Sequence, residues 1–144
     1  MGRHLYYFRS MYDETMLLIE EAREYIEDHM HSALDEHETL DSMIRIRECD
    51  RIVCRLLQVM AWVMAERAIH NQEALRDDQS AQRCAISAQE TCLMDAVPDG
   101  ITNSDPIFNL LMRSRDLYIR AMRISTQSCN IHETLPRYEQ LSPS

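Results

Sequence analysis

The chain has 144 residues, enough for one domain that buries its own core without the help of a metal or disulfides. It carries 24 acidic against 15 basic side chains, a net charge of −9, which disfavours nucleic acid because phosphate binding needs a basic surface. With two glycines and four prolines there is no glycine-rich phosphate loop and little material for tight turns, so the composition predicts an all-α fold. The first residues lack a secretory pattern and no apolar run is long enough for a membrane span. We therefore expect a cytoplasmic protein without a membrane partner.

Three long helices are predicted along the chain. The first covers residues 5–33, with apolar side chains at helical spacing on one face and acidic ones on the other. Residues 1–38 hold three Arg against ten Asp and Glu, so this helix is the acidic one. That face is explained either as a solubilising surface or as a surface that recognises a basic partner.

The second helix is predicted over residues 41–75 and has the widest apolar stripe in the chain. The apolar positions are Cys49, Val53, Leu56, Leu57, Met60, Val63 and Met64. The charged residues Asp50, Arg51, Arg55, Glu66 and Arg67 are expected at the ends and on the outer side. A stripe this wide needs two partners, which predicts the central helix of a three-helix bundle. The predicted core contains Leu18, Ile19, Leu56, Met60, Trp62, Val63 and Leu111.

Residues 76–104 form an irregular connector, in which we predict a short helix over 81–90 and a turn at Pro98-Asp99-Gly100. Asp105-Pro106 is a strong helix start, because Asp caps the first turn and Pro needs no hydrogen-bond partner there. A third helix should run to about residue 127. The sequence thus predicts one bundle domain over 1–128 and a disordered tail over 129–144, which lacks a periodic apolar face.

Few residues suggest chemistry. His31 lies in the densest group of metal-capable side chains, Asp28, His29, His31, Asp35, Glu36 and His37, but a charged helix end has the same composition. No Glu-x-x-His motif occurs, so a di-iron bundle is not indicated. Glu66 and His70 are four residues apart, a spacing more typical of a surface hydrogen bond than of an acid and base. The five cysteines include no C-x-x-C pair, and Cys49 and Cys54 on the second helix are expected to be structural. We predict no metal and no cofactor.

Three segments resemble the family of the regulator of CtrA degradation, RcdA, a group of small alphaproteobacterial three-helix proteins. The first helix contains Met16-Leu17-Leu18-Ile19-Glu20-Glu21 and Tyr25-Ile26, similar to the family's M-x-L-[VI]-E-E-x-x-x-Y-[LI] run. The second contains Arg55-Leu56, Gln58 and the stretch 61–68, AWVMAERA, similar to R-L-x-Q-x-x-S-W-L-L-x-x-R-A. The third contains residues 110–124, LLMRSRDLYIRAMRI, similar to L-L-x-R-S-x-x-L-Y-x-R-x-x-R-L. These segments follow in the family's order, whereas the segment after the first helix and the connector depart from its pattern.

The resemblance implies a non-enzymatic adaptor that delivers cell-cycle regulatory substrates to the ClpXP protease and that forms a homodimer. Its partners would be protease-side proteins and regulatory cargo. The alternative from another class is a small metal-dependent or thiol enzyme built in a helical bundle. Arg-rich and aromatic faces are enriched where proteins meet, and they give a candidate partner surface of Glu20, Glu21, Tyr25, Arg113, Tyr118, Arg120 and Arg123. The same charges could instead pair inside the bundle, Glu20 or Glu21 with Arg113 or Arg120.

Overall fold

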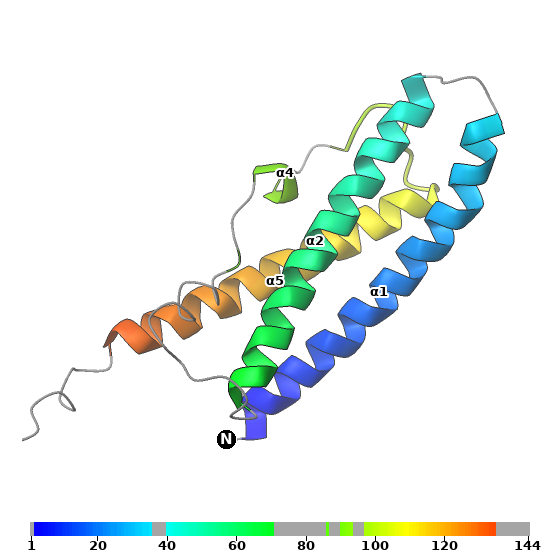
Figure 1. The fold of residues 1–144 in the computed structure, drawn as a ribbon. Coiled ribbons are helices and arrows are strands. Elements are labelled where there is room, and N and C mark those ends of the chain that lie inside the picture. The colour runs from blue at the N-terminus through cyan, green and yellow to red at the C-terminus, as the bar shows by residue number, and fades with distance from the viewer. Residues whose placement is uncertain (1, 36–39, 71–85, 87–89, 94–96, 135–144) are drawn as a thin grey trace, which may run out of the picture.

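Three long helices pack along one another: α1 (Gly2–Asp35), α2 (Leu40–His70) and α5 (Pro106–Thr134) (Figure 1). A connector with the one-turn helix α4 (Glu90–Leu93) joins α2 to α5. This computed structural model describes residues 2–35, 40–70, 86, 90–93 and 97–134. At the helix positions 2–6, 30–35, 69–70, 90–91 and 128–134 it describes the backbone alone. The predicted all-α three-helix bundle is confirmed.

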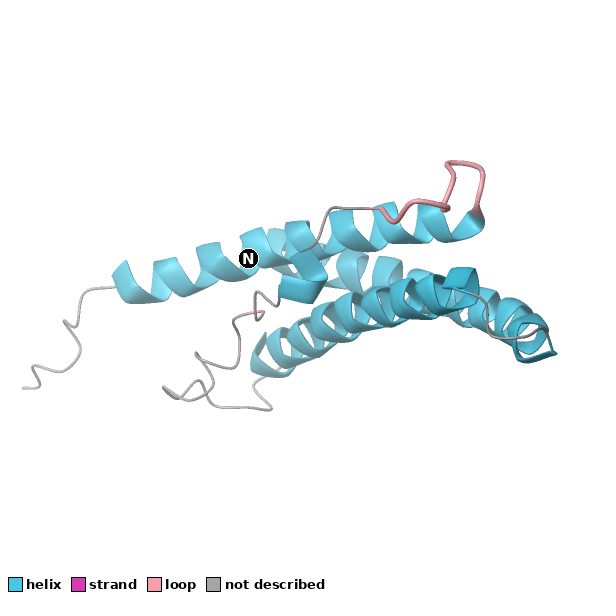
Figure 2. Ribbon diagram, turned by 90° about the horizontal axis from the view of Figure 1, so that it is seen from above, coloured by secondary structure: helices cyan, strands magenta, loops and turns pink. Residues whose placement is uncertain are grey.

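The helices form two layers. α1 and α2 run antiparallel side by side, and α5 lies against both of them (Figure 1). Seen from above, α5 occupies one side of the α1–α2 pair (Figure 2). Each of the three helices therefore covers the apolar face of the other two, which is how a bundle of this size buries one core.

The core follows the apolar stripes of the helices. From α1 it takes Phe8, Met11, Leu18, Ala22 and Tyr25, at the three-and-four spacing of one helical face. Of the predicted core residues, Leu18, Leu56, Trp62, Val63 and Leu111 are buried, whereas Ile19 and Met60 are partly exposed. The Trp62 ring meets Phe8 edge to face with 5.5 Å between the ring centroids, a favoured aromatic geometry that joins α2 to α1.

The orientation of α2 differs from the prediction. Arg51, Arg55 and Glu66, expected on the outer side, are at most 4% exposed, whereas Leu57 and Met64, expected inside, are 60% and 58% exposed. The helix is apolar on two sides, so its pattern fits two rotations about the axis. The observed rotation brings the long Arg55 side chain to hydrogen-bond acceptors on α4 and α5, which offset the cost of burying its charge.

Some element boundaries also change. α2 ends at His70, and the predicted helical residues 71–75 lie outside the described part of the chain. Ile86 is not helical, so a helix over 81–90 is wrong at that residue; the other residues of that stretch before Glu90 are outside the described part. α5 continues through Thr134, so the first six residues of the predicted tail are helical. The remaining tail residues, 135–144, are not described.

The start of α5 agrees with its sequence signals. Gly100 has a positive φ of 102°, and the Ile101 amide donates to the Pro98 carbonyl at 3.3 Å, so Gly stands where a side chain would be strained. Asp105 caps the helix, because its carboxylate accepts from the Ile107 amide at 3.4 Å and its carbonyl from the Phe108 amide at 3.0 Å. No described helix is both long and apolar enough to cross a bilayer.

Candidate functional site

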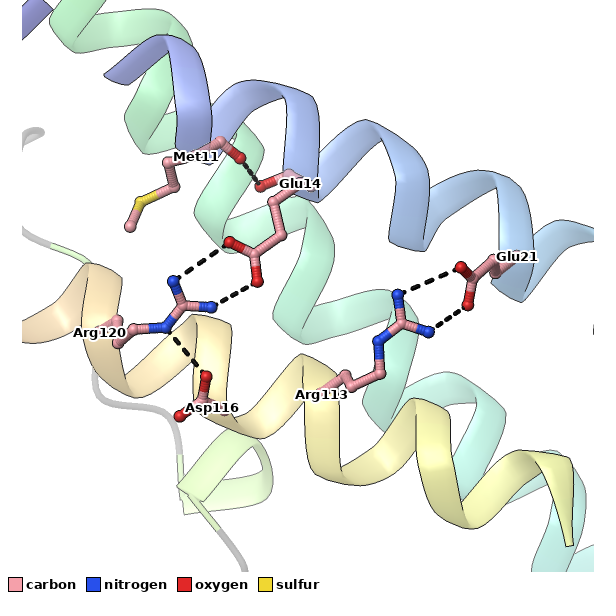
Figure 3. Close-up of polar contacts among 7 residues, drawn as sticks. Met11, Glu14, Glu21, Arg113, Asp116 and Arg120 are labelled. Atoms are coloured by element: carbon pink, nitrogen blue, oxygen red, sulfur yellow. Dashed lines mark hydrogen bonds and ion pairs between the residues drawn. The ribbon is translucent and has the colours of Figure 1, made fainter. Parts of the chain in front are cut away.

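Two bidentate ion pairs close the seam between α1 and α5. Arg113 holds both carboxylate oxygens of Glu21, with 3.1 Å between Nη2 and Oε1, and Arg120 holds both of Glu14, with 3.1 Å between Nη1 and Oε2 (Figure 3). Seven residues separate the two pairs on each helix, so they recur once per two turns of the antiparallel seam. Arg120 also donates from Nε to Asp116 on its own helix at 2.9 Å.

These contacts bear on the predicted partner surface. Glu21 and Arg113 pair with each other within the chain, Arg120 pairs with Glu14, and Glu20 belongs to neither pair. The pairing of Glu21 with Arg113 was among the intramolecular alternatives, but the partner of Arg120 is Glu14. All four side chains remain a third or more exposed, so each pair is expected to contribute only about 0.2–1 kcal/mol to stability. The guanidinium groups are thus held in place at the surface.

The two tyrosines of the predicted surface belong to the interior. Tyr118 is completely buried and Tyr25 is 7% exposed, because both lie on the core-facing sides of their helices. They cannot offer an aromatic face to a partner while the bundle is intact, which corrects the prediction. Glu20 and Arg123 are exposed, and they are the members of that set left on the open surface of α1 and α5.

A polar network ties α1, α2 and α5 together at the end where α5 begins. Arg45 donates to the Asp105 carboxylate at 2.7 Å and to the Tyr25 hydroxyl at 3.2 Å. The Arg45 hydrogen bond lowers the pKa of Asp105, and burial raises the pKa of Tyr25. The His29 ring stacks on Tyr25 with 4.0 Å between centroids, and its Nδ1 lies 3.0 Å from the Tyr25 carbonyl oxygen. Every one of these contacts is internal, so the network positions the helix cap.

Arg55 is the most deeply buried cation among the described residues, at 2% exposed. Its Nε donates to the Cys92 carbonyl at 2.9 Å, and its Nη1 donates to the Leu111 carbonyl at 3.0 Å and to the Ser114 hydroxyl at 3.3 Å. Burial lowers the pKa of the guanidinium. Arg55 therefore clamps the connector helix α4 and α5 to α2 from within the bundle.

The connector has a second anchor, at which the Ile86 amide donates to the Ser125 hydroxyl of α5 at 3.2 Å. Ile86 is 8% exposed and Cys92 is completely buried, so both apolar side chains fill space beside α5 and α2. The connector thus completes the core.

The residues singled out for metal binding or catalysis are only partly within the described part of the chain. No group of three or more His, Cys, Asp or Glu among them is placed to hold a metal ion. Of the predicted metal-capable cluster, Asp28 and His29 are described and exposed, while the side chains of 31, 35, 36 and 37 lie outside the described set. Burial raises the pKa of the Cys49 thiol to about 11, which disfavours the thiolate that nucleophilic catalysis requires. Glu66 is buried rather than on the surface, and the side chain of His70 is not described.

The outer side of α2 presents the largest series of exposed apolar side chains. The exposed large apolar residues of this helix are Leu40, Met43, Ile46, Val53, Leu57 and Met64. Single exposed apolar residues are ordinary, but a row of them along one helix marks a surface that other proteins bind. Val53, Leu57 and Met64 belong to the apolar stripe from which the sequence predicts the core, whereas Leu40, Met43 and Ile46 lie outside that stripe.

The profile of a family described as "Protein of unknown function (DUF1465)" matches residues 4–140. The chain belongs to this family. Among the described helices, the match covers α1 from residue 4 onward and the whole of α2, α4 and α5. Comparisons with curated proteins and with solved structures give no match.

Proposed function

We propose that the protein is a non-enzymatic adaptor which, like the regulator of CtrA degradation, delivers cell-cycle regulatory substrates to the ClpXP protease in the cytoplasm. We also propose that it works as a homodimer. The observation that carries the proposal is the row of exposed apolar side chains along α2, in a protein whose described buried charges hold the fold together. Such a surface suits protein binding better than catalysis.

The resemblance supports the proposal at the level of the shared scaffold. Several of the residues that carry it have structural tasks: Arg55 clamps the connector, and Trp62 and Tyr118 fill the core. Arg113 and Arg120 hold α1 against α5. A scaffold of this kind is common to proteins of different function, so the activity depends on the surfaces that the scaffold displays.

Two kinds of surface are available to partners. Beside the apolar row of α2, the exposed residues of α1 include Glu20, Glu24 and Glu27, and Arg123 is exposed on α5. Charged rims of this kind set the rate and specificity of association, while apolar groups supply most of the affinity. We assign delivery of cargo to these charged residues together with Leu40, Met43 and Ile46 at the beginning of the apolar row.

A reconstituted degradation assay tests the adaptor role. Purified ClpXP is given a candidate cell-cycle substrate with and without this protein, and the initial rate of substrate loss is measured. The proposal predicts a faster rate that saturates with adaptor concentration, and a smaller acceleration with Glu20→Arg and Arg123→Glu. Arg113→Ala, altered at a half-exposed internal pair, is the matched control and should accelerate degradation like the parent. An unchanged rate across a panel of such substrates, together with no binding to the protease in a direct titration, contradicts the proposal.

A further inference from the structure

Side chains on the outer side of α2 recur with the spacing of a coiled coil. Exposed or partly exposed side chains follow one another at alternating steps of three and four residues: Asp50, Val53, Leu57, Met60, Met64 and Arg67. Met60 is the partly exposed member, and the other five are exposed. A step that averages 3.5 residues keeps these side chains on one line along the helix, and it is the spacing by which one helix packs along another. We call this line the outer seam of α2.

The outer seam is apolar in the middle and charged at both ends. Val53, Leu57, Met60 and Met64 form its centre, Asp50 precedes them and Arg67 follows them. The sign of the charge is opposite at the two ends, so the seam carries its own electrostatic complement. Pairing two seams in parallel and in register would set Asp50 against Asp50 and Arg67 against Arg67, which repel.

Reversing one helix removes that conflict. When two seams run antiparallel about a two-fold axis between Leu57 and Met60, Asp50 meets the partner's Arg67 and Val53 meets the partner's Met64. Leu57 then meets the partner's Met60. The same contacts recur on the other side of the axis, as in any isologous interface. A surface whose apolar and charged groups match their own reversed copy favours a second copy of this chain as the occupant.

We propose that the outer seam of α2 is the homodimer interface, and that the two copies of α2 pack antiparallel with an Asp50–Arg67 ion pair at each end. This inference rests on the homodimer in the proposed function and adds its surface, direction and register. Arg67 is restrained within its own chain, because its guanidinium carbon lies 4.9 Å from the centroid of the Tyr12 ring on α1. A side chain fixed in this way loses less conformational entropy on binding.

The length of the seam sets the expected strength. From Asp50 to Arg67 an α-helix rises about 26 Å, roughly two and a half heptads, which is short for a coiled coil. The contact belongs to the smaller class of interfaces, and we expect a dimer that forms in the micromolar range and dissociates on dilution. The two charge pairs are exposed at the rim, so high salt should weaken it.

Charge reversal tests both the surface and the register. Sedimentation equilibrium at tens of micromolar should show a dimer for the parent. Asp50→Arg alone and Arg67→Asp alone place like charges at both ends, and each should raise the dimer Kd at least tenfold. A mixture of the two single variants should form a heterodimer, because each chain then supplies the charge that the other lacks. The double variant Asp50→Arg, Arg67→Asp should form a homodimer again.

Two further variants control for folding and for general charge effects. Glu24→Arg reverses an exposed charge on α1, away from the seam, and should leave the dimer Kd within twofold of the parent. Leu57→Glu, at a position that is 60% exposed, should abolish the dimer while the unfolding midpoint of the monomer stays close to the parent's. Circular dichroism of every variant reports whether the bundle is intact.

The outcomes separate this inference from the adaptor role. A parent that stays monomeric at these concentrations overturns the interface, as does a dimer that survives both single reversals. Loss of dimer without rescue in the mixture or the double variant overturns the antiparallel register. The degradation assay tests the adaptor role separately. A monomeric protein that accelerates degradation would contradict the dimer interface and support the adaptor role. A dimer that does not accelerate degradation would support the interface and contradict the adaptor role.

Discussion

The buried arginine of α2 offers the sharpest test of how the bundle and its connector hold together. Truncating Arg55 to Ala removes the donor of the Cys92 and Leu111 carbonyls at 2.9 and 3.0 Å. The Leu111 carbonyl still accepts from the Ser114 hydroxyl at 3.1 Å, so the larger penalty falls on Cys92. A buried acceptor that loses its donor costs about 1–3 kcal/mol, and the space left by the side chain adds to it. We expect the free energy of unfolding to fall by about 2–4 kcal/mol in total.

A second substitution at Arg55 distinguishes the effect of the lost hydrogen bonds from the effect of the lost side-chain volume. Arg55→Met fills much of the space and removes the cost of burying a charge, so it should be at least about 1 kcal/mol more stable than Arg55→Ala. Arg47→Ala, on the exposed side of the same helix, is the control and should stay within about 0.5 kcal/mol of the parent. Denaturation by guanidinium, followed by circular dichroism, measures all three.

Thiol labelling reports on the connector itself. Cys92 is completely buried, whereas Cys54 is exposed and gives an internal reference for reagent access. If Arg55 clamps α4, then Arg55→Ala should speed the labelling of Cys92 under native conditions and leave that of Cys54 unchanged. Peptide mapping by mass spectrometry distinguishes the two sites. An Arg55→Ala protein as stable as its parent, with Cys92 still protected, would refute the reasoning.

Three other substitutions test the core, the α1–α5 seam and the helix cap. Trp62→Ala should lower the free energy of unfolding by about 3–5 kcal/mol, and a melting temperature within a degree or two of the parent's would contradict the core assignment. Arg113→Ala should cost at most about 1 kcal/mol, because its pair with Glu21 is half exposed; a larger loss in denaturation would mean that the seam is a main support of the fold. Arg45 lowers the pKa of Asp105 from its ordinary value of 3.8, so the stability that this carboxylate contributes is present above that value and is lost as the pH falls through the lower folded pKa. Asp105→Asn should therefore make the acid unfolding curve shallower in that range. An unchanged curve would mean that the Arg45–Asp105 ion pair does not contribute to the pH dependence of stability.

The sequence predicts local features of the fold better than contacts between distant segments. Asp105 and Pro106 mark the start of α5, and Gly100 marks the turn before it, because both signals act within a few residues. The sequence predicts too early an end for α5, because the stretch after residue 128 has no apolar stripe to mark it and yet is helical through Thr134. The partner of Arg120 is 106 residues away, and the two acceptor carbonyls of Arg55 are 37 and 56 residues away. No local pattern identifies such partners.

The candidate surface was hardest to predict because α2 has two apolar sides and only one can face the core. Hydrophobic periodicity does not distinguish the two apolar sides of α2. The side that faces the core is determined by Arg55, because its buried guanidinium needs the carbonyl acceptors that α4 and α5 supply. Once that side is inside, Leu56 is buried and its neighbour Leu57 is left in solvent. A buried arginine and an exposed apolar row are the two least usual features of a bundle helix, and here each follows from the other. The charge that fixes the inner face of α2 thereby determines which apolar residues remain for a partner.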